Sequence, residues 1–325
     1  MKKSTKLAAL FLSAVMAVGV LPGCVSAQSK PVKFASATAA FPLKVTDATG
    51  TAITIKKKPQ RIISMTLGTD EMLLSLTGKS NIAALSGKIA EDAGISNIAA
   101  QAKGFTKAES NVERIISLKP DLVFAADWMD KKDLAQLRGA KIPVYCFKNA
   151  NNIAQQEQVV AQIAHVIGED TKGRKVVAGM NRTIAYVQKK VKTLSAKQKL
   201  TVLYYDPSGG YTFGAGSVFD DIATKAGLVN AAAKAGLGAD ANISKEKIIE
   251  LNPDVLILPT WYYDAKQSAA VQAGILASDR SLATVNAIKN KRIYLLPSKH
   301  INCVSQYLAL AVEDAAKAVY PKLFK

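Results

Sequence analysis

A duplicated block constrains the fold of this chain more than any other feature of the sequence. Residues 113–124 and 246–257 share the pattern Glu-x-Ile-Ile-x-Leu-x-Pro-Asp at an offset of 133 residues. In each copy an apolar helical step ends at a proline, which cannot continue a helix, and a run of β-forming residues follows. Each copy therefore predicts a short helix followed by a buried strand.

Flanking segments recur around the two copies in the same order. Residues 61–65 and 200–204 are the expected opening strands, and residues 142–145 and 292–295 the expected closing strands. Strands that alternate with helices predict parallel sheets, whose ligand sites gather at the carboxyl ends of the strands. The predicted fold class is α/β, with two lobes built on mainly parallel sheets.

Two further patterns complete the predicted architecture. Apolar residues spaced by three and four predict one long helix from Thr171 to about Leu194, roughly 34 Å long, which would join the lobes stiffly. Residues 41–55 alternate apolar and polar side chains around a glycine-containing turn and predict a β-hairpin.

The helices after the opening strands carry similar start signals. Residues 68–71 (Gly-Thr-Asp-Glu) and 216–220 (Gly-Ser-Val-Phe-Asp) each place a hydroxyl cap before first-turn acids. Both helix starts are expected to face one cleft. Anion binding is one possible role there, and structural capping by these residues is the preferred interpretation.

The N-terminus has the pattern of an export signal. Three lysines precede an apolar run over residues 7–21, and Leu21-Pro22-Gly23-Cys24 resembles the lipobox of bacterial lipoproteins, which predicts lipidation of Cys24. Ordinary cleavage after residues 25–27 is the alternative. Residues 24–40 are small and polar and predict a flexible tether. The predicted division of the chain is signal 1–23, tether 24–40, first lobe 41–150, connecting helical segment 151–198 and second lobe 199–325.

The strong positive charge does not favour a nucleic-acid partner. The formal net charge is +18, and removal of the three signal lysines leaves +15. The remaining lysines are scattered or lie on helix faces without interleaved aromatic residues, and an exported protein meets no genome. A solvated basic surface facing the cell envelope is the better interpretation.

Aromatic residues gather in the loops that follow the predicted strands. Such faces suit a broad, partly apolar ligand such as a macrocycle or a catecholate. For any single aromatic residue, packing in a lobe core is an equal alternative. The predicted ligand contacts are Met65, Thr66, Trp128, Tyr205, Tyr211, Trp261 and Tyr262.

The metal-ligand residue types are sparse. His300 follows the last predicted strand and is a candidate haem ligand, opposite Met65 or a tyrosine, although a surface loop position is the alternative. His165 lies in a helical stretch and is expected to be structural. Cys146 and Cys303 are expected to be free, partly buried thiols. No closely spaced ligand set predicts a bare metal site, so the expected cargo is a complex and no permanent cofactor is expected.

No motif predicts catalysis. The glycine-rich segments 206–210 and 214–217 match neither a nucleophile elbow nor a phosphate-binding P-loop. We therefore expect a binding protein rather than an enzyme. A surface adhesin or haem scavenger that never meets a permease is the alternative of another class.

Several segments in this order resemble the helical-backbone class of ABC-transporter substrate-binding proteins, which carry ferric siderophores, haem or vitamin B12. They are the hairpin ending in residues 58–64, the duplicated block, the connecting helix and the closing run 287–297. The similarity spans roughly residues 41–324. It implies a monomer with the ligand between its lobes, held outside the cytoplasm at the membrane by its lipid anchor.

The resemblance also implies partners and docking residues. In that family one glutamate per lobe pairs with arginines of a permease dimer that works with ATPase subunits, and the matching residues here are Glu113 and Glu246. A two-fold permease needs two related acidic contacts, which the duplication supplies. Stabilisation of a helix N-terminus is the alternative role. The implied cargo is an iron complex, either a ferric siderophore or haem, with cobalamin as the alternative.

Overall fold

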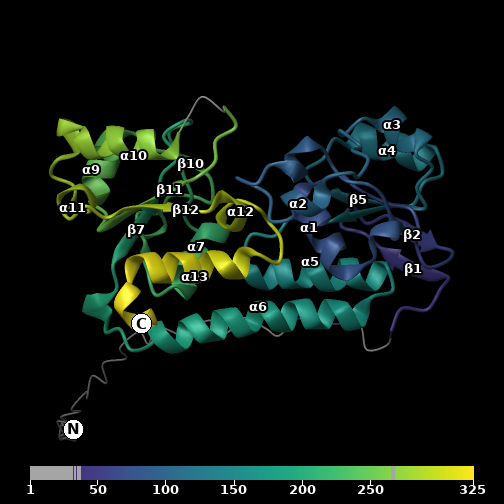
Figure 1. Ribbon diagram of the computed structural model, residues 1–325, viewed down its shortest axis with the longest axis horizontal. Coiled ribbons are helices and arrows are strands. Elements are labelled where there is room, and N and C mark those ends of the chain that lie inside the picture. The colour runs from purple at the N-terminus through teal and green to yellow at the C-terminus, as the bar shows by residue number, and fades with distance from the viewer. Residues whose placement is uncertain (1–31, 33, 35–37, 265–267) are drawn as a thin grey trace, which may run out of the picture. The chain divides into compact units, whose positions relative to one another are not determined.

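The computed structural model describes residues 32, 34, 38–264 and 268–325. The predicted export signal, Cys24 and most of the predicted tether lie outside the described residues. Two four-stranded parallel sheets and the helices around them make up most of the described chain, as Figure 1 shows. The predicted α/β class with two lobes is confirmed.

The first lobe begins with the predicted hairpin, in which β1 (Leu43–Thr46) pairs antiparallel with β2 (Ala52–Ile55). Its parallel sheet has the order β4-β3-β5-β6. These strands are β3 (Ile62–Ser64), β4 (Ile82–Ala84), β5 (Leu122–Ala126) and β6 (Val144–Phe147). Its helices are α1 (Leu67–Leu76), α2 (Ala99–Ala102), α3 (Val112–Ser117) and α4 (Lys131–Gly139), with short 3-10 turns at Lys79–Asn81 and Lys88–Glu91.

The second lobe repeats this sheet with the order β12-β11-β7-β9. Its strands are β7 (Thr201–Tyr204), β9 (Val229–Asn230), β11 (Val255–Pro259) and β12 (Ile293–Leu296), beside a small antiparallel pair, β8 (Tyr211–Thr212) and β10 (Ala241–Asn242). Its helices are α7 (Val218–Lys225), α8 (Ala231–Lys234), α9 (Lys245–Leu251), α10 (Ala269–Ser278), α11 (Asn286–Lys289), α12 (Ser298–Ile301) and α13 (Leu308–Val319), with 3-10 turns at Ala196–Gln198, Arg280–Leu282 and Pro321–Phe324.

The central strand of each sheet is buried on both faces. In β5, Phe124 packs into one apolar cluster and Val123 into another, and in β11 Ile257 and Leu256 are divided in the same way. Side chains of a strand alternate between faces, so an uninterrupted apolar run is what a doubly covered parallel strand requires.

The duplicated block explains the shared geometry of the lobes. Lys119 and Asn252, which are equivalent positions, both turn with positive φ (50° and 42°) and end their helices before the proline. The aspartate that follows fixes the opening strand, because Asp121 accepts from the Arg61 amide at 2.9 Å and Asp254 from the Thr201 amide at 3.0 Å. The repeated Pro-Asp step therefore joins each helix to its sheet.

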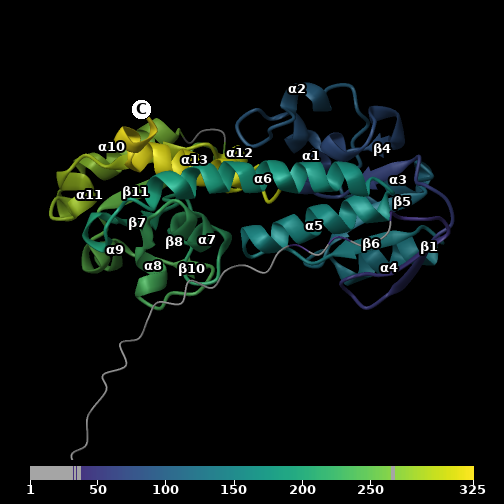
Figure 2. The same cartoon turned by 90° about the horizontal axis from the view of Figure 1, so that it is seen from below.

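The predicted connecting helix is confirmed as α6, with 22 residues from Asp170 to Val191. It follows α5 (Ile153–Val166) and buries one stripe of apolar side chains, including Met180, Ile184 and Val187. It packs against α5 and α13, and it runs along both lobes in Figure 1 and Figure 2.

Candidate ligand-binding cleft

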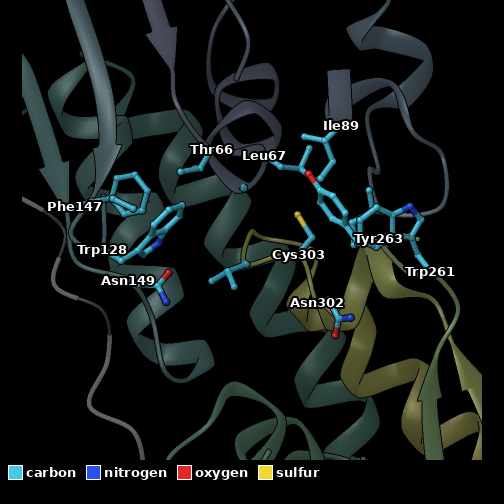
Figure 3. A pocket seen from close by; sticks show the side chains of 14 residues that line it. Thr66, Leu67, Ile89, Trp128, Phe147, Asn149, Trp261, Tyr263, Asn302 and Cys303 are labelled. Carbon is cyan, nitrogen blue, oxygen red and sulfur yellow. The ribbon is translucent and has the colours of Figure 1, made fainter. Parts of the chain in front are cut away.

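Two adjoining cavities lie where the carboxyl ends of the two sheets face each other. The first has a volume of about 420 Å³ and the second about 470 Å³, and both are lined by Thr66, Leu67, Ile89, Trp128 and Tyr263. The first is also lined by Gly68, Ile95, Ala126, Phe147, Asn149, Trp261, Asn302, Cys303 and Val304, as Figure 3 shows in part. Together they form a cleft between the lobes, and cavities of this size suit small-molecule ligands.

Strand ends place the aromatic side chains in the cleft. Trp128 follows β5, Phe147 ends β6, and Trp261 and Tyr263 follow β11. Trp128 and Phe147 lie on one side of the first cavity, and Trp261 and Tyr263 on the other (Figure 3). Trp128 is 66% exposed and Tyr263 is 90% exposed. Large exposed apolar side chains in a concave site typically mark a ligand-binding surface.

The lining of the cleft is weakly charged. Among the described residues that line the two cavities, Lys88 is the one cation and Glu109 the one carboxylate. Asn149 and Asn302 add amide donors and acceptors. The arrangement favours a broad ligand that makes apolar contacts and uses neutral hydrogen-bonding groups.

The floor of the cleft is the start of α1, and here the structure differs from the prediction. The capping residue is Thr66 rather than Thr69, and its hydroxyl accepts from the Thr69 amide at 3.2 Å. Asp70 and Glu71, the acids predicted in the first turn, are completely buried. Their carboxylates accept hydrogen bonds from other segments, whereas it is the Thr66 hydroxyl that caps an amide of the α1 start.

Hydrogen bonds from both lobes hold the buried carboxylates. Asp70 accepts from the Ser86 hydroxyl at 2.6 Å, and burial raises its pKa to about 7 despite that bond. Glu71 accepts from the Ser305 hydroxyl at 2.5 Å, the Asn97 amide at 2.7 Å and the Cys303 thiol at 3.1 Å. Burial raises the pKa of Glu71 as well. Glu71 thus joins α1 to the segment that leads into α13.

Four of the residues predicted to contact ligand lie at the cleft. Thr66, Trp128 and Trp261 line the first cavity, and Met65 lines the second. Cys146 and Cys303 form no disulfide with each other, and both are buried rather than partly buried as expected.

The structure places the other three aromatic candidates away from these cavities. Tyr205 and Tyr262 are each only 6% exposed, and Tyr211 packs edge-on against Phe213. Burial raises the pKa of Tyr262 to about 12, so its phenol stays protonated. Trp261 and Tyr263 line the first cavity, whereas the side chain of Tyr262 is buried. The chain bends at residues 260 and 263, so no regular periodicity in the sequence would have selected Tyr263 instead of Tyr262.

His300 does not serve as the expected cleft ligand. Its Nδ1 lies 2.6 Å from a carboxylate oxygen of Asp314 on α13, and it is not among the residues that line the two cavities. His165 is similarly paired with Asp170 at 2.9 Å, in line with its expected structural role. Within the described ranges no group of three or more His, Cys, Asp or Glu side chains is arranged to hold a metal ion.

Glu113 and Glu246 occupy matching exposed positions in the first turns of α3 and α9. Asn111 and Ser244 cap these helices by accepting from the amides of Arg114 (2.8 Å) and Lys247 (3.2 Å). A hydrogen bond with Ser244 lowers the pKa of Glu246, which keeps it ionised. In Figure 1 the two helices lie in different lobes, both above α6.

Over the residues that the structure describes, no helix combines the length and the apolar character needed to cross a membrane.

Comparison with known proteins agrees with this architecture. The uncharacterized ABC transporter substrate-binding lipoprotein YvrC of Bacillus subtilis is 28% identical over 98% of this chain and 97% of its own length. A cobalamin-binding protein of Halobacterium salinarum is 25% identical over 91% of this chain and 80% of its own length. The molybdate periplasmic binding protein MolA of Haemophilus influenzae has the same fold, with a TM-score of 0.71 at 21% identity, over 87% of this chain and 92% of MolA. The sequence profile of the periplasmic binding proteins matches residues 62–300, and the chain belongs to that family.

Proposed function

We propose that this chain is the substrate-binding component of an ABC importer outside the cytoplasmic membrane, and that it binds a corrinoid such as cobalamin in the cleft. The observation that carries the proposal is the aromatic lining of the cleft by Trp128, Trp261 and Tyr263, with one cation and one carboxylate among the described residues that line the two cavities. The chain acts as a binding protein rather than an enzyme.

The small number of charged residues in the cleft favours a corrinoid over a ferric catecholate or haem. A ferric catecholate carries negative charge and haem carries two propionates, so both call for cationic partners in a site of low dielectric constant. Lys88 alone supplies a positive charge among the described lining residues, and Glu109 lies in the same cavity. A corrinoid instead presents a broad ring with peripheral amides, which match aromatic walls and the side chains of Asn149 and Asn302. One relative of the chain is named a cobalamin-binding protein, which supports the same class.

Haem is the second candidate, on the strength of one residue. The hydroxyl of Tyr263 points into the cleft in Figure 3, and a tyrosine oxygen is a known axial ligand of haem iron. Haem binding would then depend on Tyr263 and would leave a characteristic absorption band.

A comparative titration tests the cargo assignment. The purified protein is titrated with cyanocobalamin, haemin and a ferric catecholate, and binding of cyanocobalamin is the expected result. Trp128→Ala should weaken that binding about tenfold or more, because a large aromatic contact is lost. Tyr186→Ala is the matched control, since Tyr186 is an exposed aromatic residue on α6 outside the cleft. Binding of haemin but not cyanocobalamin would overturn the assignment.

We propose further that Glu113 and Glu246 dock the two lobes on a permease dimer. Their support is their equivalence in the repeat and their exposure on a chain that is otherwise strongly basic. Double substitution Glu113→Ala and Glu246→Ala should abolish ligand-driven uptake in vesicles that contain the permease and its ATPase, while the affinity for ligand is retained. Glu250→Ala, an exposed glutamate on α9, serves as the control. An equal loss of ligand affinity in the double variant would contradict a docking role.

Lipidation of Cys24 completes the proposal. A tether from the membrane to the lobes raises the effective concentration of the receptor near its permease. Cys24→Ser should release the protein from the membrane fraction and leave ligand binding unchanged. Retention of that variant on the membrane would argue against the anchor.

A further inference from the structure

One contact crosses from the second lobe to the first at the edge of the cleft. The indole Nε1–H of Trp261 donates to a carboxylate oxygen of Asp92 at 2.7 Å, and the two residues are 169 positions apart in the chain. A hydrogen bond to an ionised acceptor is stronger than one between neutral groups. The bond therefore ties the loop after β11 to the loop after β4.

The loop of the first lobe is shaped to receive the indole. The second carboxylate oxygen of Asp92 accepts from the Gly94 amide at 2.8 Å, which orients the acceptor. A Cβ atom at position 94 would lie 2.7 Å from Cδ1 of Trp261, closer than real side chains approach. Glycine at this position thus lets the indole lie directly against the backbone.

Trp261 is itself held firmly by its own lobe. The backbone amides of Thr260 and Trp261 both donate to the Ser298 hydroxyl, at 3.0 and 2.9 Å. The ring of Tyr263 meets that of Trp261 edge-on, with centroids 5.8 Å apart. The Ser298 bonds fix the backbone at Trp261, and the indole ring itself contacts Asp92 and Tyr263.

On the opposite side of the cleft, the tryptophan is more exposed than Trp261. Trp128 is 66% exposed, and in Figure 3 it lies across the cavity from Trp261. Ile89 and Ile95, which flank the Asp92 loop, line the same cavity as Trp261. A ligand in the cavity would therefore touch Trp261 and the loop that carries Asp92 on one side. On the other side it would touch the exposed Trp128.

We propose that Trp261, Asp92 and Gly94 form a cross-lobe clasp that closes one side of the cleft and slows escape of the bound ligand, so that the ligand enters and leaves on the Trp128 side. Trp261 and Asp92 are positioning residues in this scheme, because they hold the two lobes together at this edge of the cleft. The retention role rests on the proposed function, whereas the clasp itself does not.

The clasp can be tested without ligand because the chain contains two tryptophans. The variant Trp128→Phe leaves Trp261 as the single tryptophan, and its emission then reports on the clasp alone. Adding Asp92→Ala should expose the indole and raise its quenching by acrylamide, whereas Asp92→Asn, which keeps an acceptor oxygen, should change it less. Equal quenching in all three proteins would overturn the clasp.

Retention is tested by the dissociation rate of cyanocobalamin. Trp261→Phe and Asp92→Ala should each raise that rate about three- to tenfold, as expected for the loss of one partly exposed charge-assisted hydrogen bond. The double variant should dissociate no faster than the faster single variant, since both substitutions break the same bond. Unchanged dissociation rates, or effects that add fully, would overturn the retention role. If the wild type does not bind cyanocobalamin, the proposed cargo fails and the quenching experiment still decides the clasp.

Discussion

The two lobes share one sheet order, yet their opening helices begin in different surroundings. Thr66 caps α1 and Ser217 caps α7, each accepting from the amide three residues on. The acids that follow are completely buried in α1, at Asp70 and Glu71, whereas those in the first turn of α7 are partly exposed. The two helices thus share the same kind of cap and differ in what surrounds the acids that follow it.

The cause of the difference is the chain segment that packs on each helix. Val304 lies against the start of α1 so closely that a Cβ on Gly68 would be 2.3 Å from its carbonyl oxygen. The same segment brings the Ser305 hydroxyl to Glu71. In α7, Asp221 instead accepts from the Ile153 amide at 2.9 Å and pairs with Lys225 near solvent. The junction between the lobes is therefore built on α1, beside the cleft.

The largest expected effect is at Glu71. Glu71→Ala leaves several buried donors without their acceptor and should lower the free energy of unfolding by roughly 3 kcal/mol. Asp221→Ala, the matched change in α7, should cost about 1 kcal/mol, because fewer hydrogen bonds are lost and they are only partly buried. Urea unfolding of both variants makes the comparison. Equal losses would mean that the junction does not depend on α1.

A smaller effect concerns pH. The pKa of Asp70 is raised to about 7, so the folded protein holds a proton there that the unfolded chain releases near pH 4. The stability linked to this proton is present below about pH 4 and is lost as the pH rises to about 7. The stability of the wild type relative to Asp70→Asn should fall by about 2 kcal/mol between about pH 5 and pH 7.

The second lobe supplies a control of opposite sign for this pH dependence. Hydrogen bonds from Lys245 and Ser281 lower the pKa of Asp279 to about 2. The stability linked to Asp279 is therefore present above about pH 4 and is lost as the pH falls toward 2. The advantage of the wild type over Asp279→Asn should accordingly shrink on acidification. The comparison of wild type with Asp70→Asn and the comparison of wild type with Asp279→Asn should change with pH in opposite directions. The same direction in both would refute this difference between the two carboxylates.

The smallest expected effect is at the helix caps Thr66 and Ser217. Loss of either cap should lower the free energy of unfolding by a similar amount. Thr66→Ala and Ser217→Ala should each cost about 1 kcal/mol, because each removes the acceptor for one helix amide. Only Thr66 lines the cleft, so only Thr66→Ala should also change ligand affinity. Thermal unfolding and ligand titration of both variants give the two readouts. A change in affinity with Ser217→Ala would show that α7 also contributes to the site.

Sequence patterns predicted those parts of the fold that depend on local periodicity. The repeat, the hairpin and the connecting helix α6 all follow from spacing and turn residues, and each is present. The burial of Glu71 was not predictable, because its partner Ser305 lies 234 residues away. His300 was misassigned for a similar reason, since its partner Asp314 lies on another element.

The candidate site was predicted in outline and missed in detail. The aromatic character of the loops indicated the correct ends of the sheets, and Trp128 and Trp261 both lie at the cleft. Tyr262 was predicted to contact ligand, but it is buried and Tyr263 lines the cavity instead. The bends after β11 decide this, and they leave no periodic signal in the sequence. The Trp261 contact with Asp92 required knowledge of how the lobes meet.

The most direct test of the central claim is amide hydrogen exchange with and without cyanocobalamin. Binding in the cleft predicts slower exchange in the segments around residues 65–68, 87–97, 126–129 and 260–263, with α6 and the β1–β2 hairpin unchanged. Protection confined to surfaces outside these segments, or no protection at saturating cyanocobalamin, would contradict the account.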